Sequence, residues 1–318
     1  MTSDDAKEPK IVQRPRNMAA SVNRRLLNRA HEQREDFSIL LTRYALERLL
    51  YRLTQSEHAS SFVLKGALLF SLWSGHPHRA TRDLDLLGYG EPNASRLEGI
   101  FRNLCLTPVD DDGLTFLADS VQATLVREDQ EYNGLRINLR AMLDKARIPL
   151  QVDIGFGDAV TPAPVDMQFP TMLDFPSANV RAYTRETVIA EKFQAMVKLG
   201  IANSRMKDFY DIHVLARLFP FDGPLLRRAI QTTFDRRRTA VPEDTPLALT
   251  DEFANDTAKQ AQWTAFMRKG KLEPMGLTLA EVIVFLQGFI MPPTLALARG
   301  KAFDETWLPG GPWQSTTA

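Results

Sequence analysis

Two stretches decide the fold, Phe62-Val-Leu-Lys-Gly-Ala67 and, one helix length later, Arg79-Ala-Thr-Arg-Asp-Leu-Asp-Leu-Leu-Gly88. The first predicts an apolar strand that ends in a glycine turn. In the second, Asp83 and Asp85 alternate with leucines. Because successive side chains of a strand point to opposite faces, both carboxylates project from one face while the leucines reach a core.

Neighbouring carboxylates of this kind have a chemical consequence. Two negative side chains repel each other unless a cation lies between them, and hard divalent ions prefer such oxygen ligands. A glycine turn lets backbone N–H groups approach a phosphate. A turn of this kind facing a carboxylate-held metal is the minimal equipment for handling a nucleoside triphosphate.

Simpler interpretations exist for both motifs. An Asp-x-Asp pair also occurs at solvated strand edges and in turns. An EF-hand loop would begin in the same way, but its fifth and twelfth positions would be Leu87 and Ala94, whose side chains offer calcium no oxygen. A Walker-type phosphate loop is excluded because Gly66 is not followed by Gly-Lys-Ser/Thr.

Length and composition set the broad class. The chain of 318 residues is long enough for two modest domains and a substantial core. Cys105 is the single cysteine, which excludes an internal disulfide and zinc sites built from several cysteines. The apolar run at 283–286 is too short to span a bilayer, and the N-terminus has no basic-then-apolar signal layout. We therefore expect a cytoplasmic protein with no membrane partner.

Arginines cluster in two places although the 39 basic and 39 acidic residues of the chain balance. Such clusters can follow a phosphate backbone, but they also occur on solvated helix faces, so charge alone leaves contact with RNA open. The residues are Arg14, Arg16, Arg24, Arg25 and Arg29 near the N-terminus, and Arg227, Arg228, Arg236, Arg237 and Arg238 beyond the middle.

Hydrophobic periodicity predicts the order of the elements. Helices are expected at 18–53, up to Trp73, and at 95–104, and strands at 62–65, 83–87, 120–128, 135–139 and 148–154. The strands at 120–128 and 135–139 are consistent with an antiparallel hairpin. In the last strand Asp153 lies between Val152 and Ile154. The proline-rich segment 161–176 predicts a linker, the rest is expected to be helical, and the residues from Gly310 onward resemble a frayed tail.

Three carboxylates on two strands, Asp83, Asp85 and Asp153, with a glycine turn upstream, match the active-site plan of the nucleotidyltransferase fold. The chain resembles the AbiEii/AbiGii-type (MenT-like) nucleotidyltransferase toxins of type IV-like bacterial toxin–antitoxin pairs. The resemblance covers roughly residues 20 to 218. Its five segments are Phe62-Val-Leu-Lys-Gly66, Arg79-Ala-Thr-Arg-Asp-Leu-Asp85, Gln151-Val-Asp-Ile-Gly155, Arg185-Glu-Thr-Val-Ile-Ala-Glu-Lys192 and Arg205-Met-Lys-Asp-Phe-Tyr-Asp211.

The resemblance implies an α/β (α+β) fold. A nucleotidyltransferase lobe with a mixed sheet is expected at 1–165, including the N-terminal helices. A mainly helical lobe at 166–318 would complete the active-site cleft between the two.

The resemblance also implies the site. Magnesium, in a site that can hold two metal ions, would be bound by Asp83, Asp85 and Asp153, with a nucleoside triphosphate as substrate. Asp153 would complete the metal site or act as a base. The implied catalytic residues are Asp83, Asp85, Asp153, Lys192 and Asp208, and the implied nucleotide-binding residues are Lys65, Gly66, Ala67, Arg79, Arg82, Lys192 and Asp211.

Some of these residues have structural alternatives. Lys192 borders an apolar stripe, so it either pairs with a neighbouring acid or points its ammonium group into the cleft. Asp208 can cap a helix or pair with Lys207 or Arg205. His78, separated from His76 by Pro77, predicts a surface loop more than a metal ligand.

One position departs from the family pattern. The family usually has Gly-Gly or Gly-Ser followed by a hydroxyl residue, whereas here Ala67 and two leucines follow Gly66. The loss of one neutral hydrogen bond to phosphate costs about 0.5–1.5 kcal/mol, at most roughly a tenfold effect. Phosphate binding is therefore expected to be weaker, but not abolished.

The resemblance implies the acceptor and the partner. The acceptor would be the 3′ end of tRNA, which the added nucleotides block from aminoacylation so that translation stops. A cognate antitoxin of an AbiEi-like type would restrain the enzyme. Two alternatives stay open, namely nucleotide transfer to a protein hydroxyl or a small molecule, and a catalytically silent nucleotide-binding module.

Overall fold

The computed structural model describes residues 17–128, 132–272, 274 and 276–315. Arg14 and Arg16 lie outside these residues. Two helices open the described chain, α1 (Met18–Gln33) and α2 (Phe37–Thr54). The predicted single helical region is divided because Arg34 takes a left-handed conformation and Asp36 caps α2, accepting from two backbone N–H groups.

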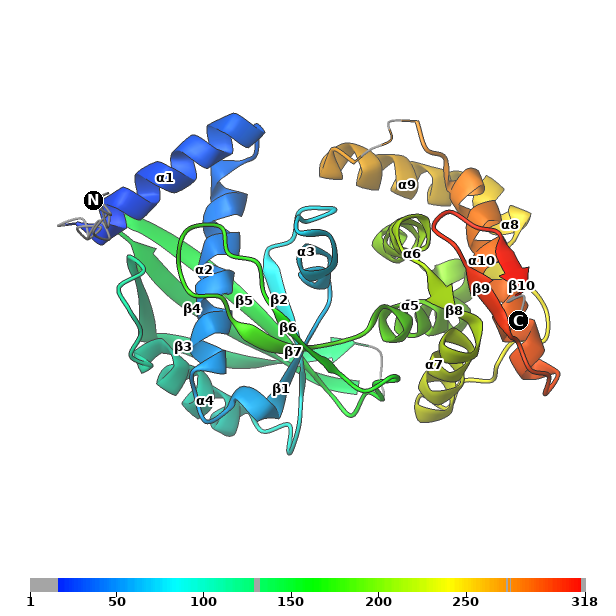
Figure 1. The fold of residues 1–318 in the computed structure, drawn as a ribbon, viewed down its shortest axis with the longest axis horizontal. Coiled ribbons are helices and arrows are strands. Elements are labelled where there is room, and N and C mark those ends of the chain that lie inside the picture. Colours follow the sequence, from blue (N-terminus) through cyan, green and yellow to red (C-terminus); the bar gives the residue numbers. More distant parts are fainter. Residues whose placement is uncertain (1–16, 129–131, 273, 275, 316–318) are drawn as a thin grey trace, which may run out of the picture.

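A seven-stranded mixed sheet forms the centre of the first part of the chain (Figure 1). The strand order is β3-β4-β5-β2-β1-β7-β6, with β2–β5 and β1–β7 parallel and the other pairs antiparallel. The mixed α/β fold class is confirmed. The strands are β1 (Phe62–Lys65), β2 (Asp83–Gly88), β3 (Leu114–Glu128), β4 (Tyr132–Leu143), β5 (Ala146–Phe156), β6 (Val165–Gln168) and β7 (Asn179–Ala182).

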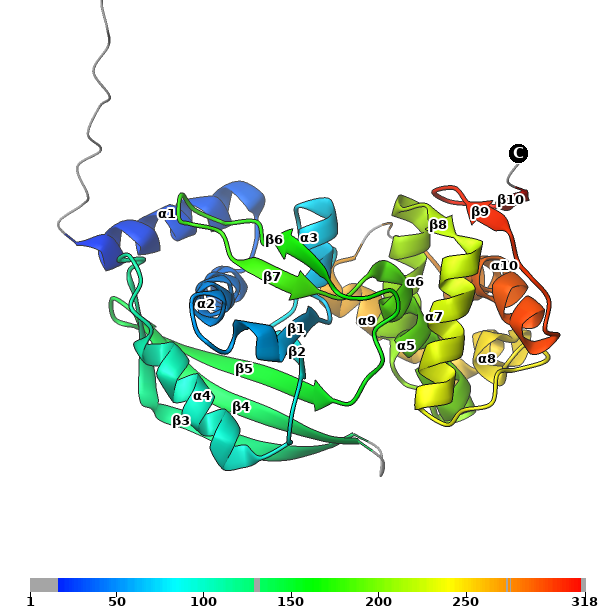
Figure 2. The same ribbon diagram turned by 60° about the horizontal axis from the view of Figure 1, so that its bottom comes forward.

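Helices α2 and α4 (Ala94–Leu106) pack on the sheet and on each other. Figure 2 shows α2 lying over the strands at the centre of the sheet. Fully buried side chains of both helices, including Leu46 and Leu97, belong to the same hydrophobic core as Leu84 and Leu86 of β2. Because this face is sealed by apolar packing, polar side chains of β2 and β5 are confined to the opposite face.

The predicted linker is wrong. It contains β6, which pairs with β7, and β7 in turn pairs with β1 through Leu64 and Ala182. The sheet thus continues beyond the predicted boundary at residue 165 and reaches Ala182. Proline is tolerated beside edge strands, which lack one set of ladder partners, so the composition of this segment concealed the edge strand β6.

The second part of the chain is mainly helical. It contains α5 (Arg185–Leu199), α6 (Met206–Leu218), α7 (Gly223–Arg236), α8 (Asp251–Asn255), α9 (Thr257–Gly270) and α10 (Leu279–Ala298). In Figure 1 these helices lie beside the sheet, with α5 leading from β7 into them. The described elements from Arg185 onward belong to this part, and their colours in Figure 1 run from green to red.

The end of the described chain is ordered, contrary to the predicted frayed tail. A small antiparallel sheet is formed by β8 (Phe221–Asp222), β9 (Glu305–Trp307) and β10 (Trp313–Ser315). Trp313 stacks on Phe289 of α10 at 5.8 Å between ring centroids, and its indole N–H donates to the Phe289 carbonyl. Burial of these aromatic rings fixes the segment against α10.

Helix α10 is more apolar than the short run at 283–286 indicated. Its 20 residues are long and apolar enough to cross a membrane by length and composition alone. Half of its apolar window is buried inside the protein, where it packs against α6, α7 and α8. That burial is typical of the core helix of a helical bundle.

Candidate active site

The carboxylate pair of β2 has the predicted geometry. Leu84 and Leu86 are buried, whereas Asp83 and Asp85 are only partly buried on the opposite face. In the parallel pairing of β2 with β5, Asp85 lies directly beside Asp153. All three predicted carboxylates therefore lie on one face of the sheet.

The glycine turn packs directly against this pair. Gly66 follows β1 with a φ of +76°, a conformation that side chains rarely adopt. A Cβ atom at this position would lie 1.9 Å from Oδ2 of Asp85. Helix α3 (Leu69–Ser74) begins soon afterwards, and the Ala67 methyl group is buried. Only glycine lets the backbone approach the carboxylate this closely.

The pKa values of both carboxyls are raised. Burial raises the pKa of Asp85 to about 6, and the neighbouring Asp153 and Asp83 add to the shift, although Lys65 and Lys207 oppose it. Burial, followed by the charge of Asp153, also raises the pKa of Asp83. Because burial disfavours the charged form of both carboxyls, a divalent cation bound between them would stabilise that form.

Asp153 differs from the β2 pair because an arginine holds it. Arg136 of β4 donates from Nε to Oδ1 at 2.7 Å and from Nη2 to Oδ2 at 2.9 Å. The Gln151 amide donates to Oδ2 as well, at 3.2 Å. Sequence reasoning missed Arg136, because its role depends on the register of β4 against β5.

The predicted three-carboxylate metal site is not assembled in this arrangement. Within the described ranges, no group of three His, Cys, Asp or Glu side chains is arranged to hold a metal ion. Magnesium needs only one or two protein carboxylates when substrate phosphates supply further oxygens. Asp83 and Asp85, with their raised pKa values, fit that donor set, whereas Asp153 is engaged by Arg136.

A second group of acids lies on α6 and is fully paired with cations. Lys192 of α5 contacts Asp208 at 2.6 Å and Asp211 at 2.9 Å between Nζ and carboxylate oxygens. Arg205 Nε donates to the remaining oxygen of Asp208 at 2.7 Å. Burial would raise the pKa of Asp211, but Lys192 and Arg79 overcome this and lower it well below its usual range.

The loop before β2 is anchored to this α6 cluster. Arg79 donates to both oxygens of Asp211, at 2.9 and 3.1 Å. His78 Nε2 contacts the same carboxylate at 2.6 Å, while its ring stacks on Phe70 and Tyr210. The predicted surface loop is therefore wrong for His78, whose side chain is only 7% exposed and joins the loop before β2 to α6.

A third cluster links β1 to α5 and α7. Lys65 contacts Asp158 at 2.8 Å and Glu191 at 3.4 Å, and Arg237 contacts Asp158 at 2.9 Å. Sequence reasoning did not assign Asp158 or Glu191 to the site, and it considered Arg237 only as a member of an arginine cluster. The signal at Asp158 was its place just after Gly155 and Gly157, where the chain leaves the carboxylate-bearing strand.

A cavity of about 180 Å³ lies between the sheet and the helices. Residues from both parts of the chain line it. The sheet contributes Lys65, Asp85 and Asp153, and the helical part contributes Lys198, Arg205 and Arg237. Opposite charges thus face each other across the space next to the Gly66 turn.

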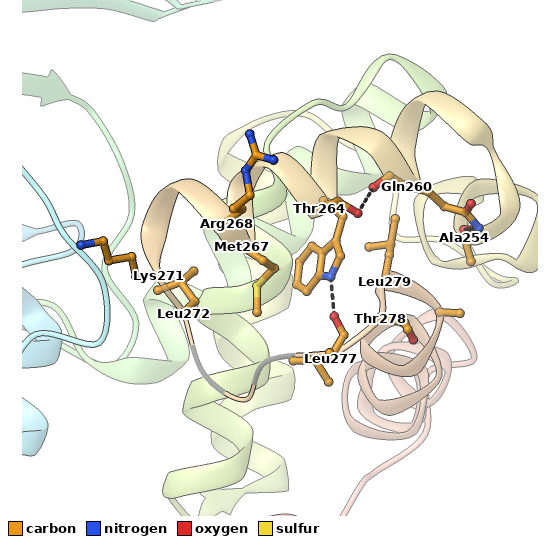
Figure 3. Close-up of a pocket in the computed structure, with 13 residues that line it drawn as sticks. Ala254, Gln260, Thr264, Met267, Arg268, Lys271, Leu272, Leu277, Thr278 and Leu279 are labelled. Carbon is orange, nitrogen blue, oxygen red and sulfur yellow. Dashed lines mark hydrogen bonds between the residues drawn. The ribbon is translucent and has the colours of Figure 1, made fainter.

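A larger cavity, of about 870 Å³, lies between α9 and the start of α10 (Figure 3). Its walls are mainly apolar, with Trp263, Met267 and Leu272 among them, and the Trp263 indole N–H donates to the Leu277 carbonyl. None of the described residues that line it carries a carboxylate. Its chemistry does not suit a metal-bound triphosphate, so the smaller cavity is the candidate active site.

Two cations near β2 lie differently from expectation. Arg82 is exposed and is not among the residues that line the cavity. Its charge instead lowers the pKa of Asp36 at the start of α2. Lys207, in the first turn of α6, is exposed and lowers the pKa values of both Asp83 and Asp85. Lys207 is thus a cation of the site that was considered only as a partner of Asp208.

Comparison with known proteins gives the family. The family model described as nucleotidyl transferase AbiEii toxin, type IV toxin–antitoxin system, matches residues 48–283. The chain belongs to the AbiEii nucleotidyl transferase toxin family. It is accordingly a nucleotidyltransferase of toxin type, and membership of a toxin–antitoxin system implies an antitoxin partner. Members of this family generally use a nucleoside triphosphate and a divalent metal.

Two solved structures resemble this AbiEii protein. The crystal structure of JHP933 from Helicobacter pylori is 15% identical, with a TM-score of 0.45, and the match covers 82% of this chain and 90% of that chain. A nucleotidyltransferase structure from H. pylori is 17% identical, with a TM-score of 0.48, covering 83% of this chain and 98% of that chain. No curated protein matches the sequence.

Proposed function

We propose that this AbiEii protein transfers nucleotides from a nucleoside triphosphate to the 3′ end of tRNA in a magnesium-dependent reaction. Added nucleotides would block aminoacylation and hence translation. The observation that carries the proposal is the Asp83/Asp85 pair, whose carboxyls have raised pKa values and whose Asp85 packs against the Gly66 turn and lines the interlobe cavity. An antitoxin of an AbiEi-like type would act as the partner.

The residues around the cavity divide the work. Asp83 and Asp85 would hold Mg²⁺, which neutralises charge on the triphosphate as pyrophosphate leaves. Backbone N–H groups after Gly66, together with Lys65 and Lys207, hold the phosphates. The acceptor oxygen forms a bond to the α-phosphorus while the bond between the α- and β-phosphates breaks, and the hydroxyl proton passes to water.

The α6 cluster supports this arrangement from behind. Lys192 binds Asp208 and Asp211, and Asp211 holds Arg79 of the loop that leads into β2. Because these charges neutralise one another in the interior, the cluster fixes the position of β2 relative to α6. Lys192 and Asp208 then act by keeping the carboxylate pair and Lys207 facing the same space.

A labelling experiment tests the proposal. Pure protein is incubated with total tRNA and each α-labelled nucleoside triphosphate, next to Asp83→Ala and the control Asp166→Ala. Asp166 is an exposed aspartate on β6 of the same sheet. We expect label in tRNA with the wild type and Asp166→Ala but not with Asp83→Ala. Label found only in protein or in a small product would contradict the tRNA acceptor.

A further inference from the structure

The Arg136–Asp153 pair is built into the sheet. The two residues are register partners on the neighbouring antiparallel strands β4 and β5. The guanidinium group spans both carboxylate oxygens, an arrangement that fixes its plane as well as its position. The Arg136 side chain is still 35% exposed, and its charge lowers the pKa of Asp83. A fixed, accessible cation thus lies on the carboxylate face.

The strand order places this cation on a definite side of the metal-binding pair. Along β4-β5-β2-β1, the Gly66 turn ends β1, the carboxylate pair lies on β2, and Arg136 lies on β4. Neighbouring strands are about 4.8 Å apart, so β4 is roughly 10 Å from β2 and about 14 Å from β1. Arg136 and the phosphate-binding turn therefore flank the pair from opposite sides.

The geometry of phosphoryl transfer gives these two sides different roles. The attacking oxygen and the leaving group lie roughly in line through the phosphorus atom. With the triphosphate on the Gly66 turn, pyrophosphate leaves on the β1 side. The acceptor hydroxyl must then approach from the side of β5 and β4, where Asp153 and Arg136 lie.

We infer that Arg136 binds a backbone phosphate of the acceptor and that Asp153 is the positioning residue that orients it. This inference rests on the proposed function and narrows it, because a guanidinium group at the acceptor side selects a nucleic-acid end over a protein hydroxyl. Asp153 then lies outside the metal site, and Asp83 and Asp85 are the two protein ligands of the ion. This positioning role replaces the roles as metal ligand or base that the sequence analysis gave to Asp153.

The test uses Arg136→Gln, Asp153→Asn, the double variant, and Arg140→Gln as a matched control. Arg140 is an exposed arginine on the same strand and face, four residues further along. Affinity for fluorescently labelled tRNA is measured over a range of salt concentrations. Mn²⁺ affinity is measured by electron paramagnetic resonance with a non-hydrolysable nucleoside triphosphate, with Asp83→Asn as the reference for loss. Melting curves establish that each variant is folded.

We expect Arg136→Gln to weaken tRNA binding about tenfold and to reduce the slope of log affinity against log salt by about 1, as for one lost phosphate contact. Asp153→Asn should weaken tRNA binding several-fold, and the double variant should be no worse than Arg136→Gln, because one residue acts through the other. A further variant, Arg136→Lys, keeps the positive charge and should therefore show the salt slope of the wild type. Arg140→Gln should leave tRNA affinity within about twofold, since exposed charges away from the site contribute little.

The affinity for Mn²⁺ tests whether Asp153 lies outside the metal site. Asp153→Asn should retain Mn²⁺ with an affinity within about twofold of the wild type, because the residue it replaces is held by an arginine. Loss of Mn²⁺ by Asp153→Asn to the extent seen in Asp83→Asn would overturn the inference, as would tRNA binding unchanged by Arg136→Gln. Label transferred to protein instead of tRNA would overturn the proposed function, and the Mn²⁺ result would still decide the place of Asp153.

Discussion

The two aspartate pairs of this protein make an instructive contrast. Asp83 and Asp85 on β2 have raised pKa values, whereas Asp208 and Asp211 on α6 have lowered ones. The α6 pair is the more deeply buried of the two, and burial alone would raise its pKa values further. The difference is that Lys192, Arg79 and Arg205 contact the α6 pair directly.

This contrast separates a site from its scaffold. The α6 acids form ion pairs with cationic side chains of the same chain, and these pairs hold the folded structure together. The β2 acids repel each other and gain a full partner only when a cation binds. A region that is electrostatically unsatisfied in the folded chain is where a ligand has the most to contribute.

The largest effect is expected from removing one charge of the β2 pair. Asp83→Asn or Asp85→Asn should lower nucleotide transfer roughly a thousandfold, because metal stabilisation of the leaving group contributes several kcal/mol. The melting temperature should stay the same or rise, since a repulsive charge is lost. Transfer assays and calorimetry on the same preparations check both results, and a large fall in melting temperature would contradict the contrast.

The α6 cluster should respond in the opposite way. Lys192→Met leaves two buried carboxylates without their shared cation, which should lower the free energy of unfolding by about 3–5 kcal/mol. Urea denaturation measures this value, with Lys145→Met in an exposed turn as the control. Full stability of Lys192→Met together with loss of transfer would instead place this lysine on the nucleotide.

Two glycines separate backbone strain from a clash with the carboxylate. Gly66 and Gly75 have similar φ values of +76° and +78°, but only at Gly66 would a Cβ meet Asp85. Gly66→Ala and Gly75→Ala should both cost about 1–2 kcal/mol of stability because both adopt a left-handed conformation. Gly66→Ala alone should also lower nucleotide transfer, by at least about tenfold. Equal activity of the two variants would show that the close approach is not needed.

The raised pKa of Asp85 predicts a pH dependence of stability. A carboxyl with a folded pKa of about 6 and an ordinary unfolded value of 3.8 binds more protons in the folded state between these values. Its contribution to stability therefore falls as pH rises from about 4 to about 6. Denaturation of metal-free protein and Asp85→Asn should show equal stability near pH 4 and a more stable variant near pH 7. A constant difference across this range would contradict the shift.

The smallest expected effect is at the turn itself. Ala67→Ser restores a hydroxyl group where the family usually has one, and it should tighten nucleotide binding by up to about tenfold. Calorimetric titration with a non-hydrolysable triphosphate measures the change. Weaker binding would show that the buried Ala67 position has no room or partner for a hydroxyl.

Local patterns predicted the part of the site that depends on one strand or one turn. Strand alternation placed Asp83 and Asp85 on one face, and the glycine turn beside them could be read from the sequence. The Arg136–Asp153 pair could not, because a strand pattern does not give the register of a neighbouring strand. His78 was misplaced for a related reason, since its stacking partner Tyr210 lies far along the chain.

The helical part of the fold was harder to anticipate in detail. The extension of the sheet past residue 165 could not be predicted, because β6, a short edge strand, lies in proline-rich sequence and β7 is only four residues long. The final strands depend on Trp307 and Trp313 packing on α10, which is a tertiary effect. The ion pairs of the α6 acids could be predicted only as alternatives, because they form where α5 and the loop before β2 meet α6.

The central claim, that the unsatisfied β2 pair is the metal site, is tested most directly by a crystal structure with Mn²⁺ and a non-hydrolysable nucleoside triphosphate. Our account predicts an anomalous peak between Asp83 and Asp85, with the triphosphate along the Gly66 turn. A peak at the Lys192 cluster, or nucleotide bound with no metal beside Asp85, would contradict it.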